Sequence, residues 1–483
     1  MQTEVVVIGA GPGGYAAAFQ AADKGKKVLL VERAARLGGV CLHEGCIPSK
    51  ALLQATGLIE AAQVSGLRGI RFQPPTIELD KLRAWKNSLL QKLAQGIAFL
   101  AQKRGVQVLQ GAAQFEGPRQ LQVQTGAGPV SVEFEHAVIA TGSRPVLPPA
   151  FNIGSPRVIT SSQALVLEEI PSSLLVIGGG YIGMELGTVY AALGSRVVVI
   201  EALDSILTGT DPDLVRPVLA KAKKAFQEVR LGTKVASLFA DGSQIGVVTQ
   251  SAGNERTDLF DRVLVAVGRA PNSGGLQLDR ADVTCDGSGF IETNRAQQTK
   301  NPAIFAIGDV TVGPMLAHKA VRDARVAIDA IMGETGPRPG GVIPAVVFTH
   351  PEIAWCGLTE TEAKRIGRAI EVARFPWGAS GRAVTMDGTD GLTKLVIDPA
   401  TEQILGVGIV GTGAGELIAE GVLAIEMGAT AKQLGRVVHP HPTLSETLME
   451  CAEAFYGIAT HIHSPRARKG MTGGTSSASP MSS

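Results

Sequence analysis

The stretch from Val5 to Glu32 reads VVVIGAGPGGYAAAFQAADKGKKVLLVE, and the stretch from Leu174 to Glu201 reads LLVIGGGYIGMELGTVYAALGSRVVVIE. Each copy starts with four apolar strand residues and passes through Gly-x-Gly-x-x-Gly into an Ala- and Leu-rich helix. A Val-rich strand that ends in glutamate closes each copy. Strand, glycine turn, helix and strand in this order make a βαβ unit that binds dinucleotides. Two copies predict an α/β fold with two Rossmann-like domains.

The three glycines of each fingerprint have separate tasks. The first permits a tight turn, the second lets a pyrophosphate approach the backbone, and the third lets the helix pack against the strand. The amides at the helix start then hold the phosphates. The terminal glutamate binds the hydroxyls of a ribose. The predicted contacts are Gly9, Gly11, Gly14 and Glu32 in the first copy, and Gly178, Gly180, Gly183 and Glu201 in the second.

Glu201 indicates which nucleotide the second domain binds. A carboxylate accepts hydrogen bonds from free ribose hydroxyls and repels a 2′-phosphate, whereas an NADP site places Arg nearby. The residues after Glu201, Ala-Leu-Asp-Ser-Ile, contain no Arg or Lys. The sequence therefore favours NAD. At Glu32 the same reasoning indicates only an adenosine ribose, which suits FAD equally.

Two apolar segments, 137–145 and 263–271, each combine a strand, a glycine turn and a proline, and they mark where the nucleotide domains close. A later strand at 303–309 returns to the first sheet. We therefore predict an FAD-binding domain at 1–147 and 272–345, an NAD-binding domain at 148–271, a third domain at 346–463 and a disordered tail at 464–483.

The third domain carries no nucleotide fingerprint. Its strands are expected at Ile353–Gly357, Leu392–Ile397 and Ile404–Val410, with helices near Gly415–Glu426 and after Pro442. The tail is rich in Ser, Gly and Pro, and it has too little apolar content to offset the entropy of ordering.

A cysteine pair lies directly after the first fingerprint. Cys41 and Cys46 are four residues apart in LGGVCLHEGCIPSK, with Pro48 at an expected first helical position. A thiolate near a helix N-terminus is stabilised by the helix dipole and becomes a better nucleophile. Zinc needs four ligands, and the other cysteines stand singly and far away in the sequence. We therefore expect a redox-active pair and no metal.

The motif His439-Pro-His-Pro-Thr-Leu-Ser-Glu446 supplies a candidate base. Imidazole takes a thiol proton near neutral pH. Glu446 follows His441 by five residues, so the carboxylate can hold one ring nitrogen while the other faces a substrate. A loop histidine without a role is the alternative for this motif taken alone.

The composition excludes several other classes of protein. The chain has 483 residues, 45% hydrophobic and 18% charged, and its formal charge is +1. A near-neutral balance gives no support for nucleic acid or an anionic membrane as partner. The first strand begins almost at Met1, and no apolar run reaches the ~20 residues of a membrane helix. We expect a cytoplasmic enzyme.

Together these motifs resemble those of the pyridine nucleotide–disulfide oxidoreductases, over nearly the whole chain from Val5 to about His461. The resemblance implies one FAD per subunit, NAD as second nucleotide, and a homodimer built by an α+β dimerisation domain at the C-terminus. It also implies NAD-linked oxidation of dihydrolipoamide. The implied partners are the lipoyl domains and acyltransferase core of a 2-oxoacid dehydrogenase or glycine cleavage complex.

The resemblance also assigns roles residue by residue. Cys46 would face the flavin and Cys41 would exchange with substrate, while His441 and Glu446 would act across the dimer interface. Lys50 would lie by the flavin and pair with Glu185. The implied FAD contacts are Gly9, Gly11, Gly14, Glu32, Lys50, Ala113, Thr141, Gly142, Ser143, Asp309 and Ala317. The implied NAD contacts are Gly178, Gly180, Gly183, Glu201, Val235 and Gly268.

Two positions leave questions open. Position 43 is His where the family often has Asn, which adds a second titrating group beside the pair. Tyr181 follows the second glycine of the NAD fingerprint, where it can gate the nicotinamide pocket or simply pack between sheet and helix.

Other members of the family fit less well. Glutathione-type reductases use NADP, mercuric reductases have a further cysteine pair near the C-terminus where Cys451 stands alone, and soluble transhydrogenases lack the redox pair. A structural flavoprotein subunit is the alternative from another class. The sequence does not identify the host complex.

Overall fold

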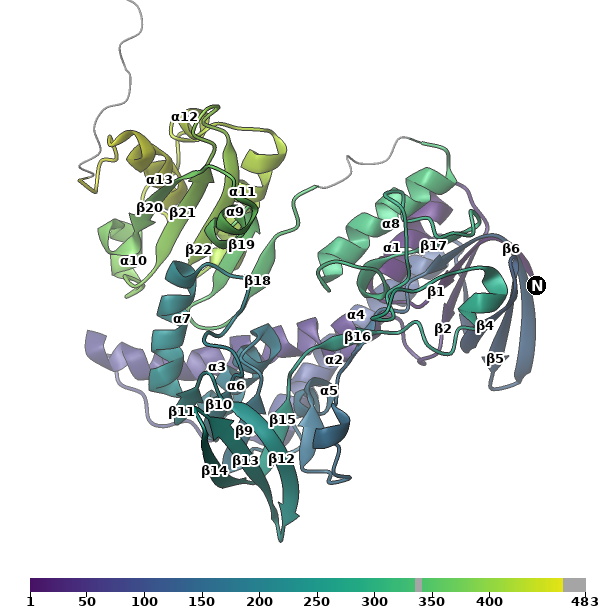
Figure 1. Cartoon of the computed structure of the whole chain (residues 1–483), viewed down its shortest axis with the longest axis horizontal. Coiled ribbons are helices and arrows are strands. Elements are labelled where there is room, and N and C mark those ends of the chain that lie inside the picture. Colours follow the sequence, from purple (N-terminus) through teal and green to yellow (C-terminus); the bar gives the residue numbers. More distant parts are fainter. Residues whose placement is uncertain (335–340, 464–483) are drawn as a thin grey trace, which may run out of the picture. The chain divides into compact units, whose positions relative to one another are not determined.

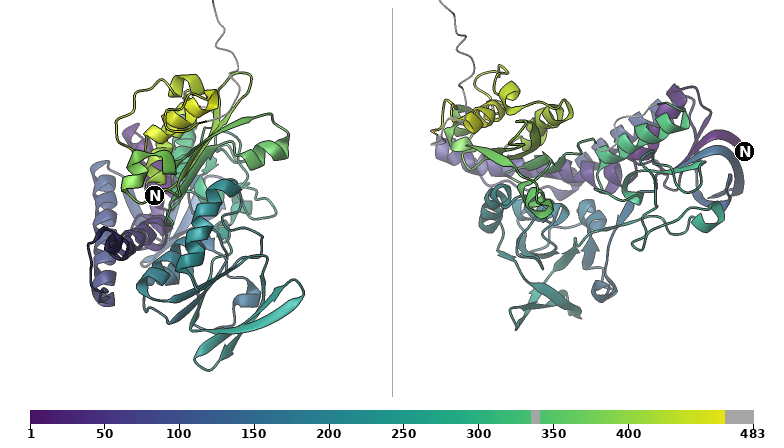
Figure 2. Two further views of the ribbon diagram at one scale, coloured as in Figure 1. Left: turned by 90° about the vertical axis from the view of Figure 1, so that its left-hand side faces the viewer. Right: turned by 45° about the horizontal axis from the view of Figure 1, so that its top comes forward.

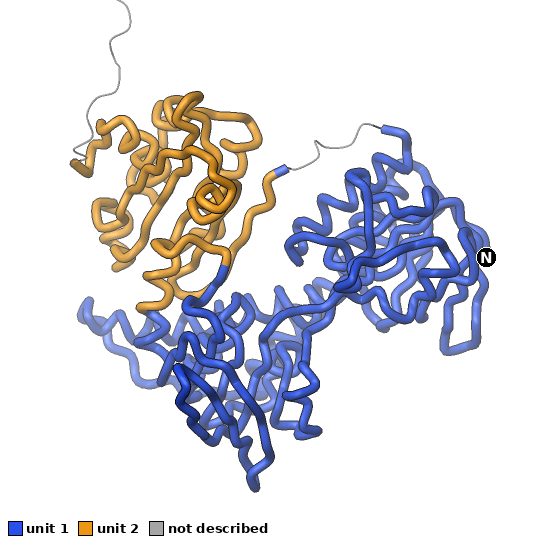
Figure 3. The backbone as a smooth tube through the Cα atoms, in the orientation of Figure 1, with its two compact units in different colours: residues 1–208, 221–341 blue, residues 209–220, 342–483 orange. Residues whose placement is uncertain are grey.

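The computed structural model describes residues 1–334 and 341–463. Its contacts separate two compact units. One contains residues 1–208 and 221–341, and the other contains residues 209–220 and 342–483 (Figure 3). The predicted tail at 464–483 lies outside the described residues.

The N-terminal sheet is mixed and has seven strands, in the order β3-β2-β1-β6-β5-β4 with β17 paired to β6 (Figure 1). Val5, Val6 and Val7 are fully buried, because both faces of the parallel part are covered. The strands are β1 (Gln2–Ile8), β2 (Val28–Glu32), β3 (Gln107–Gln110), β4 (Ala112–Gly117), β5 (Gln120–Thr125), β6 (Gly128–Ile139) and β17 (Ile304–Ala306).

Two helices cover one face of this sheet. α1 (Pro12–Asp23) and α8 (Ala317–Ile331) run side by side in Figure 1 and in the right-hand view of Figure 2. Their small buried residues, among them Ala17 and Ala324, join the core formed with β1 and β6. α1 begins with Pro12 directly after Gly11, a position where a proline costs no hydrogen bond.

The second nucleotide sheet is parallel throughout, in the order β11-β10-β9-β15-β8. A three-stranded antiparallel sheet packs against it and shares its core. The parallel strands are β8 (Val158–Thr160), β9 (Ser173–Ile177), β10 (Arg196–Ile200), β11 (Glu228–Arg230) and β15 (Arg262–Val265). The antiparallel strands are β12 (Lys234–Asp241), β13 (Gln244–Ser251) and β14 (Asn254–Phe260).

A two-stranded sheet and further helices complete the first unit. β7 (Ser143–Pro145) pairs with β16 (Arg269–Pro271) where the chain passes between the two nucleotide sheets. The other helices are α2 (Gly39–Glu44), α3 (Cys46–Ser65), α4 (Leu79–Lys103), α5 (Ser161–Val166), α6 (Tyr181–Leu193) and the later part of α7 (Pro212–Ala225).

The C-terminal unit is built on a five-stranded antiparallel sheet, in the order β18-β19-β22-β21-β20. The strands are β18 (Ala345–Val347), β19 (Ile353–Gly357), β20 (Glu371–Pro376), β21 (Leu392–Ile397) and β22 (Ile404–Val410). The helices are α9 (Glu360–Ile366), α10 (Gly381–Thr385), α11 (Ala414–Glu426), α12 (Ala431–Leu434) and α13 (Glu446–Tyr456).

One face of this sheet forms the core of the unit with α11 and α13. Leu395 points into that core, and its neighbour Lys394 contacts Asp211 at the start of α7. Because successive strand residues point to opposite faces, the start of α7 covers the other face of the sheet.

The expected fold class is confirmed: two Rossmann-like α/β sheets are followed by an α+β unit. The contacts group two stretches differently from the expected boundaries: Gly209–Ala220 and residues 342–345 lie with the C-terminal unit and not with the expected NAD- and FAD-binding domains. The expected helix start at Pro48 was wrong, because α3 begins at Cys46 and Pro48 is its third residue. The other domain boundaries stay predictions.

Candidate functional site

The two glycine turns have nearly the same backbone contacts. A Cβ on Gly9 would lie 2.5 Å from the carbonyl oxygen of Ala140, and one on Gly178 would lie 2.4 Å from that of Ala266. The chain that follows the neighbouring strand thus leaves no room for a side chain at either first glycine, and the two turns are built alike.

The second and third glycines differ from each other in the same way in both turns. A Cβ on Gly14 or Gly183 would lie 1.8 Å or 2.1 Å from the carbonyl oxygen of the first glycine of its own turn. At Gly11 the nearest atom would be 4.0 Å away, and at Gly180 nothing lies within 4 Å. The second glycine alone therefore faces open space, as an approaching pyrophosphate needs.

Glu32 and Glu201 hold their own turns with matching hydrogen bonds. The amide of Ala10 donates to Glu32 Oε2 at 2.7 Å, and the amide of Gly179 donates to Glu201 Oε2 at 2.7 Å. The other oxygen of each carboxylate accepts from the amide two residues after it, at 2.9 Å in both cases. Each carboxylate therefore orders the turn as well as being available to a ribose, a role that the sequence reasoning missed.

A cavity of about 980 Å³ opens in the first unit. Its lining brings together most of the expected FAD contacts with the cysteine pair and Tyr181. The lining residues from the expected set are Gly9, Gly11, Glu32, Lys50, Ala113, Thr141, Gly142, Ser143, Asp309, Ala317, Cys41 and Cys46. Gly14 does not line it, because its task is the close packing of helix and turn. The donors, the acid and the glycine cradle suit an elongated dinucleotide such as FAD.

Cys41 lies in α2 and Cys46 is the first residue of α3, with Gly45 between the two helices. Both thiols are free. A hydrogen bond from Cys41 and the charge of Lys50 outweigh burial and lower the pKa of Cys46 to about 7. The same hydrogen bond, together with burial, raises the pKa of Cys41. The two pKa shifts therefore favour Cys46 over Cys41 as the thiolate of a reduced pair, in the direction expected for a thiol at a helix N-terminus.

Lys50 lies one helical turn after Cys46 and makes the expected pair with Glu185. Its Nζ is 2.8 Å and 3.0 Å from the two carboxylate oxygens. The hydroxyl of Ser49 donates to the same carboxylate at 2.8 Å. Glu185 is buried on α6, so the pair joins the FAD-side helix α3 to the helix of the second fingerprint.

Asp309 is held by Ser143, the first residue of β7. Ser143 Oγ donates to Asp309 Oδ2 at 2.5 Å, and Arg269 Nε donates to the same hydroxyl at 2.8 Å. Arg269 also binds the carbonyl of Ser143 and lines the cavity. The sequence reasoning missed Arg269, although the motif Val-Gly-Arg-Ala-Pro contained it.

None of the expected NAD contacts lines this cavity. Gly178, Gly180 and Gly183 form the second turn around the start of α6, with Glu201 at the end of β10. Val235 lies on β12 and packs against the core of the second sheet, and Gly268 precedes β16. Tyr181 is the first residue of α6 and reaches the cavity.

His441 and Glu446 form the expected pair in the C-terminal unit. His441 Nδ1 lies 2.9 Å from Glu446 Oε1, and the amide of Thr443 donates to Glu446 Oε2 at 2.8 Å. Burial opposes ionisation, but the bonds from Thr443 and His441 lower the pKa of Glu446. The His441 side chain is 71% exposed, so its other nitrogen is available to a partner.

His43 lies in α2 between the two cysteines and lines the cavity. Its Nε2 is 2.8 Å from the carbonyl oxygen of Leu37, so this nitrogen carries a proton. Its Nδ1 is buried without a protein partner.

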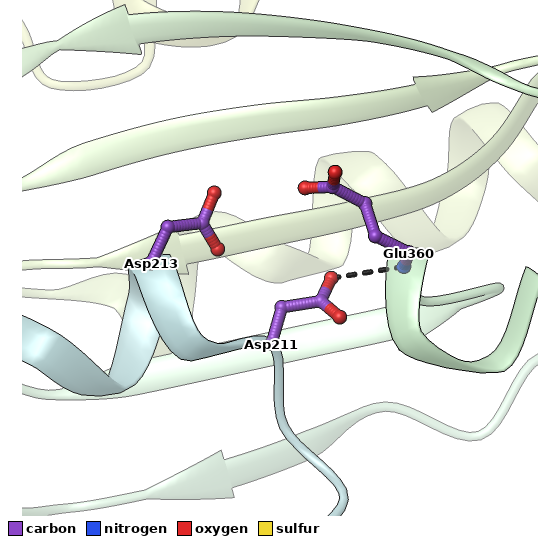
Figure 4. Close-up of side chains that lie close together, drawn as sticks. All are labelled: Asp211, Asp213 and Glu360. Carbon is purple, nitrogen blue, oxygen red and sulfur yellow. Dashed lines mark hydrogen bonds between the residues drawn. The ribbon is translucent and has the colours of Figure 1, made fainter. Parts of the chain in front are cut away.

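Asp211, Asp213 and Glu360 bring three carboxylates within reach of one another (Figure 4). Among the described residues they form the group whose geometry could suit a metal ion. Lys394 Nζ lies 2.7 Å, 2.7 Å and 2.9 Å from these three carboxylates. The ammonium group therefore occupies the place that a cation would take, and the cluster is an ion-pair network.

Residues 3–324 match the model of the pyridine nucleotide-disulphide oxidoreductases, and residues 343–452 match that family's dimerisation domain. The chain belongs to the pyridine nucleotide-disulphide oxidoreductase family. The expected class, a flavin-dependent disulfide oxidoreductase, is thereby confirmed, and the dimerisation domain supports the expected homodimer.

Curated relatives are similar over nearly their whole length. Dihydrolipoyl dehydrogenase of Haemophilus influenzae is 44% identical over 470 residues, which cover 97% of this chain and 98% of that protein. Dihydrolipoyl dehydrogenase of Thermus scotoductus is 44% identical, with 95% and 98% covered.

Solved structures of more distant sequence share the fold. LpdA from Mycobacterium tuberculosis has a TM-score of 0.87 at 26% identity, with 94% of this chain and 99% of that chain covered. The HOCl-induced flavoprotein disulfide reductase RclA from Escherichia coli, solved as a Cu(II) complex, has a TM-score of 0.84 at 27% identity, with 94% and 99% covered. In the described ranges of this chain, none of the helices combines the length and apolar character that a membrane crossing requires.

Proposed function

We propose that this chain catalyses the dihydrolipoyl dehydrogenase reaction. Dihydrolipoamide gives two electrons and two protons and becomes the cyclic disulfide. NAD⁺ takes two electrons and one proton to become NADH, and the second proton is released. The supporting observation is that Cys41, Cys46 and the Lys50–Glu185 pair line the same cavity as the first glycine turn, in a chain 44% identical to a dihydrolipoyl dehydrogenase over nearly its whole length.

FAD, when bound, supplies two-electron exchange with both a thiol pair and a nicotinamide. The chain would hold it with the first glycine turn, Glu32, Lys50 and Asp309. The positive charge of Lys50 would stabilise the Cys46 thiolate. In the oxidised pair, a thiol of dihydrolipoamide would attack Cys41 and release Cys46, the sulfur that faces the flavin. The second substrate thiol would then displace Cys41, which leaves the substrate as the cyclic disulfide and both cysteines reduced.

The second turn would bind NAD rather than NADP. Glu201 carries a negative charge at the ribose position, where a 2′-phosphate would be repelled. No Arg or Lys follows it in the next five residues. Tyr181, which reaches the cavity from the start of α6, is the proposed gate to the nicotinamide position.

His441 and Glu446 would act as the base and its orienting acid. The carboxylate fixes one ring nitrogen, and the exposed nitrogen accepts a proton from the incoming dithiol. We propose that this pair serves the cysteines of the second subunit in a homodimer. The lipoyl domain of an acyltransferase core is the proposed macromolecular partner.

The test is anaerobic turnover by the purified, flavin-containing protein. We expect NADH formation from dihydrolipoamide and NAD, slow or no reaction with NADP, and loss of turnover in Cys46→Ser. NADH-dependent reduction of other disulfides or of Cu(II), without any turnover of dihydrolipoamide, would instead place the activity with another branch of the family.

A further inference from the structure

Helix α8 carries a buried ion pair that does not line the cavity. Lys319 and Asp323 are four residues apart, so they lie on one face of the helix. Lys319 Nζ is 2.8 Å from Asp323 Oδ2, and the two side chains are only 8% and 5% exposed. Taking two charges out of water is costly, so a buried pair depends on further hydrogen bonds that satisfy both charged groups.

Both charged groups bind the same turn, at residues 308–311, which follows strand β17. The amide of Gly308 donates to Asp323 Oδ2 at 3.1 Å, and Lys319 Nζ donates to the carbonyl oxygen of Gly308 at 3.1 Å. Lys319 Nζ also donates to Thr311 Oγ1 at 2.9 Å, and this hydroxyl donates to the same carbonyl oxygen at 2.8 Å. The three donors of the ammonium group thus have three acceptors, and the ion pair binds both backbone polar groups of Gly308.

Close packing fixes the same turn against α8. Gly308 has a φ of +74°, in the left-handed region that favours glycine. A Cβ on Gly308 would lie 2.9 Å from the Cβ of Ala320 on α8, and a Cβ on Gly13 in the first turn of α1 would lie 3.1 Å from it. The turn is therefore placed on α8 by packing as well as by the hydrogen bonds of the ion pair.

The turn carries Asp309, which directly follows Gly308. Asp309 lines the cavity, whereas neither Lys319 nor Asp323 does. Ser143 Oγ donates to Asp309 Oδ2 at 2.5 Å. Among the described residues, no protein group binds the other oxygen, Oδ1. Asp309 Oδ1 is therefore the oxygen that can accept a hydrogen bond from a ligand in the cavity.

We propose that Lys319 and Asp323 are positioning residues for the flavin cofactor: the ion pair holds the turn at 308–311 so that Asp309 Oδ1 accepts a hydrogen bond from a hydroxyl of FAD. The inference rests on the proposed function, which assigns FAD to this cavity. The two residues lie outside the cavity lining, and they act through the backbone of Gly308.

A role in stability alone would give a different result. Each single substitution by an apolar residue leaves one buried charge unpaired, which destabilises a protein strongly. The double variant Lys319→Met/Asp323→Leu has no unpaired charge, and such double replacements are often neutral for stability. It still lacks the donor and the acceptor for Gly308. Stability and FAD affinity should therefore separate in the double variant.

The measurement is release of FAD from the holoenzyme, followed by the fluorescence of free flavin on serial dilution. Lys319→Met, Asp323→Leu and the double variant should each raise the dissociation constant of FAD about tenfold, the equivalent of one charge-assisted hydrogen bond. In an equal excess of FAD, the double variant should have a higher thermal unfolding midpoint than either single variant. An FAD dissociation constant in the double variant equal to that of wild type would overturn the inference.

Lys394→Met is the matched control. Lys394 is also a buried lysine that binds carboxylates, but it belongs to the C-terminal unit. Its substitution should lower the unfolding midpoint and leave the dissociation constant of FAD unchanged. If Lys394→Met weakened FAD binding as much as Lys319→Met does, the effect would be one of general stability and the positioning role would be refuted.

A double-mutant cycle tests whether the ion pair acts through Asp309. Asp309→Ala should raise the dissociation constant of FAD about ten- to a hundredfold. Adding Lys319→Met/Asp323→Leu to that variant should raise it by less than about twofold more, because both changes remove the same hydrogen bond. A further tenfold rise would mean that the pair affects FAD by another route, against the inference.

These measurements separate the inference from the proposed function, because FAD release requires no turnover. A wild-type flavoprotein that fails to oxidise dihydrolipoamide refutes the proposed function, and the FAD affinities of the variants still test the role of the ion pair. A double variant that oxidises dihydrolipoamide and holds FAD as tightly as wild type refutes the positioning role alone.

Discussion

Cys41 and Cys46 have different protonation preferences although they share one hydrogen bond. The pKa of Cys46 is lowered to about 7 by the Cys41 donor and Lys50, whereas that of Cys41 is raised. The more acidic sulfur is the first residue of α3, where the helix dipole adds to the effect of Lys50.

This difference gives a spectroscopic expectation. In flavin-containing Cys41→Ser, a long-wavelength thiolate–flavin band should appear without substrate as pH rises through about 7. The serine hydroxyl still donates to Cys46, whereas Cys41→Ala lacks that donor and should develop the band at higher pH. Absorbance titrations compare the two. A band that persists in Cys46→Ser would reverse the assignment of the sulfurs.

Glu201 should control affinity for the second nucleotide. A hydrogen bond to a charged group contributes roughly 1.5–3 kcal/mol, or about ten- to a hundredfold in affinity. Glu201→Ala should therefore raise KM for NAD by that factor and leave flavin content unchanged. Glu32→Ala is the matched variant and should lower flavin retention. Steady-state kinetics and flavin absorbance measure both, and an NADP preference in the unmodified enzyme would contradict the assignment.

At this scale the sequence predicted single residues well where a local motif carried them. The Lys50–Glu185 pair and the His441–Glu446 pair are both present. It did not predict that Glu32 and Glu201 bind the amides of their own turns, because ribose recognition already explained a glutamate there. His461 Nδ1 lies 2.5 Å from Glu450 Oε1, a contact between α13 and the segment after it that leaves no periodic pattern in the sequence.

Substitutions in the second glycine turn can separate nucleotide binding from packing of the turn. Gly180→Ala adds a methyl group with no protein atom within 4 Å, so the protein should fold and keep flavin. That methyl group should displace the NAD phosphates and raise KM for NAD by on the order of tenfold, equivalent to one lost charge-assisted hydrogen bond.

Gly183→Ala is the contrasting variant, because its methyl group would lie 2.1 Å from the carbonyl oxygen of Gly178. It should lower the thermal unfolding midpoint and the yield of folded protein. Equal stability of the two variants would show that the second and third glycines do not have the separate tasks assigned to them.

The start of α7 is fixed to the C-terminal sheet by Lys394. The Lys394 side chain is 1% exposed, and its ammonium group binds three carboxylates. Lys394→Met would leave the buried carboxylate of Asp211 without its cation, whereas Asp213 and Glu360 keep Arg374. Removing one partner of a buried ion pair typically costs about 3–5 kcal/mol. Thermal unfolding should show a large destabilisation, whereas Lys364→Met on exposed α9 should stay within about 0.5 kcal/mol of wild type.

The pH dependence of that destabilisation has a definite sign. Burial opposes ionisation of Asp211 and Asp213, but their bonds to Lys394 lower the pKa of both carboxyls. Their contribution to the free energy of unfolding is therefore present above the ordinary pKa of an aspartate and is lost as pH falls through the lowered pKa. Bonds to the same carboxylates raise the pKa of Lys394 against burial, so its contribution is lost only at alkaline pH. The difference in the free energy of unfolding between wild type and Lys394→Met should therefore become smaller as pH falls. A difference that stays constant with pH would argue against an ionic origin.

Elements were predicted best where the pattern was apolar and short. The strands expected at Ile353–Gly357, Leu392–Ile397 and Ile404–Val410 coincide with β19, β21 and β22. Helix α4 and the antiparallel β12–β14 sheet were not predicted. Helix α4 has a largely exposed surface and no clear apolar stripe, and the antiparallel sheet has an exposed face. The ion pairs of Lys394 join residues far apart in sequence, so no local signal indicated them.

The cysteines and the base of the proposed reaction belong to different units of the molecule. The cysteine pair belongs to the unit with both nucleotide sheets, and His441 and Glu446 belong to the C-terminal unit. The match to the dimerisation domain covers both His441 and Glu446. A homodimer with a two-fold axis has isologous interfaces, so it would contain two equivalent composite sites.

Refolding two inactive variants together tests that arrangement. Cys46→Ser and His441→Gln should each be nearly inactive, since positioned proton transfer contributes roughly 10²–10⁴-fold in rate. In a mixed dimer, one site would receive an intact cysteine pair from one chain and His441 from the other, while the second site would lack both. We expect activity near half that of wild type per mixed dimer. Two different affinity tags would isolate the mixed species, and each variant refolded alone is the control. Mixed dimers that form but stay inactive would mean that the base and the cysteines of one site come from the same chain.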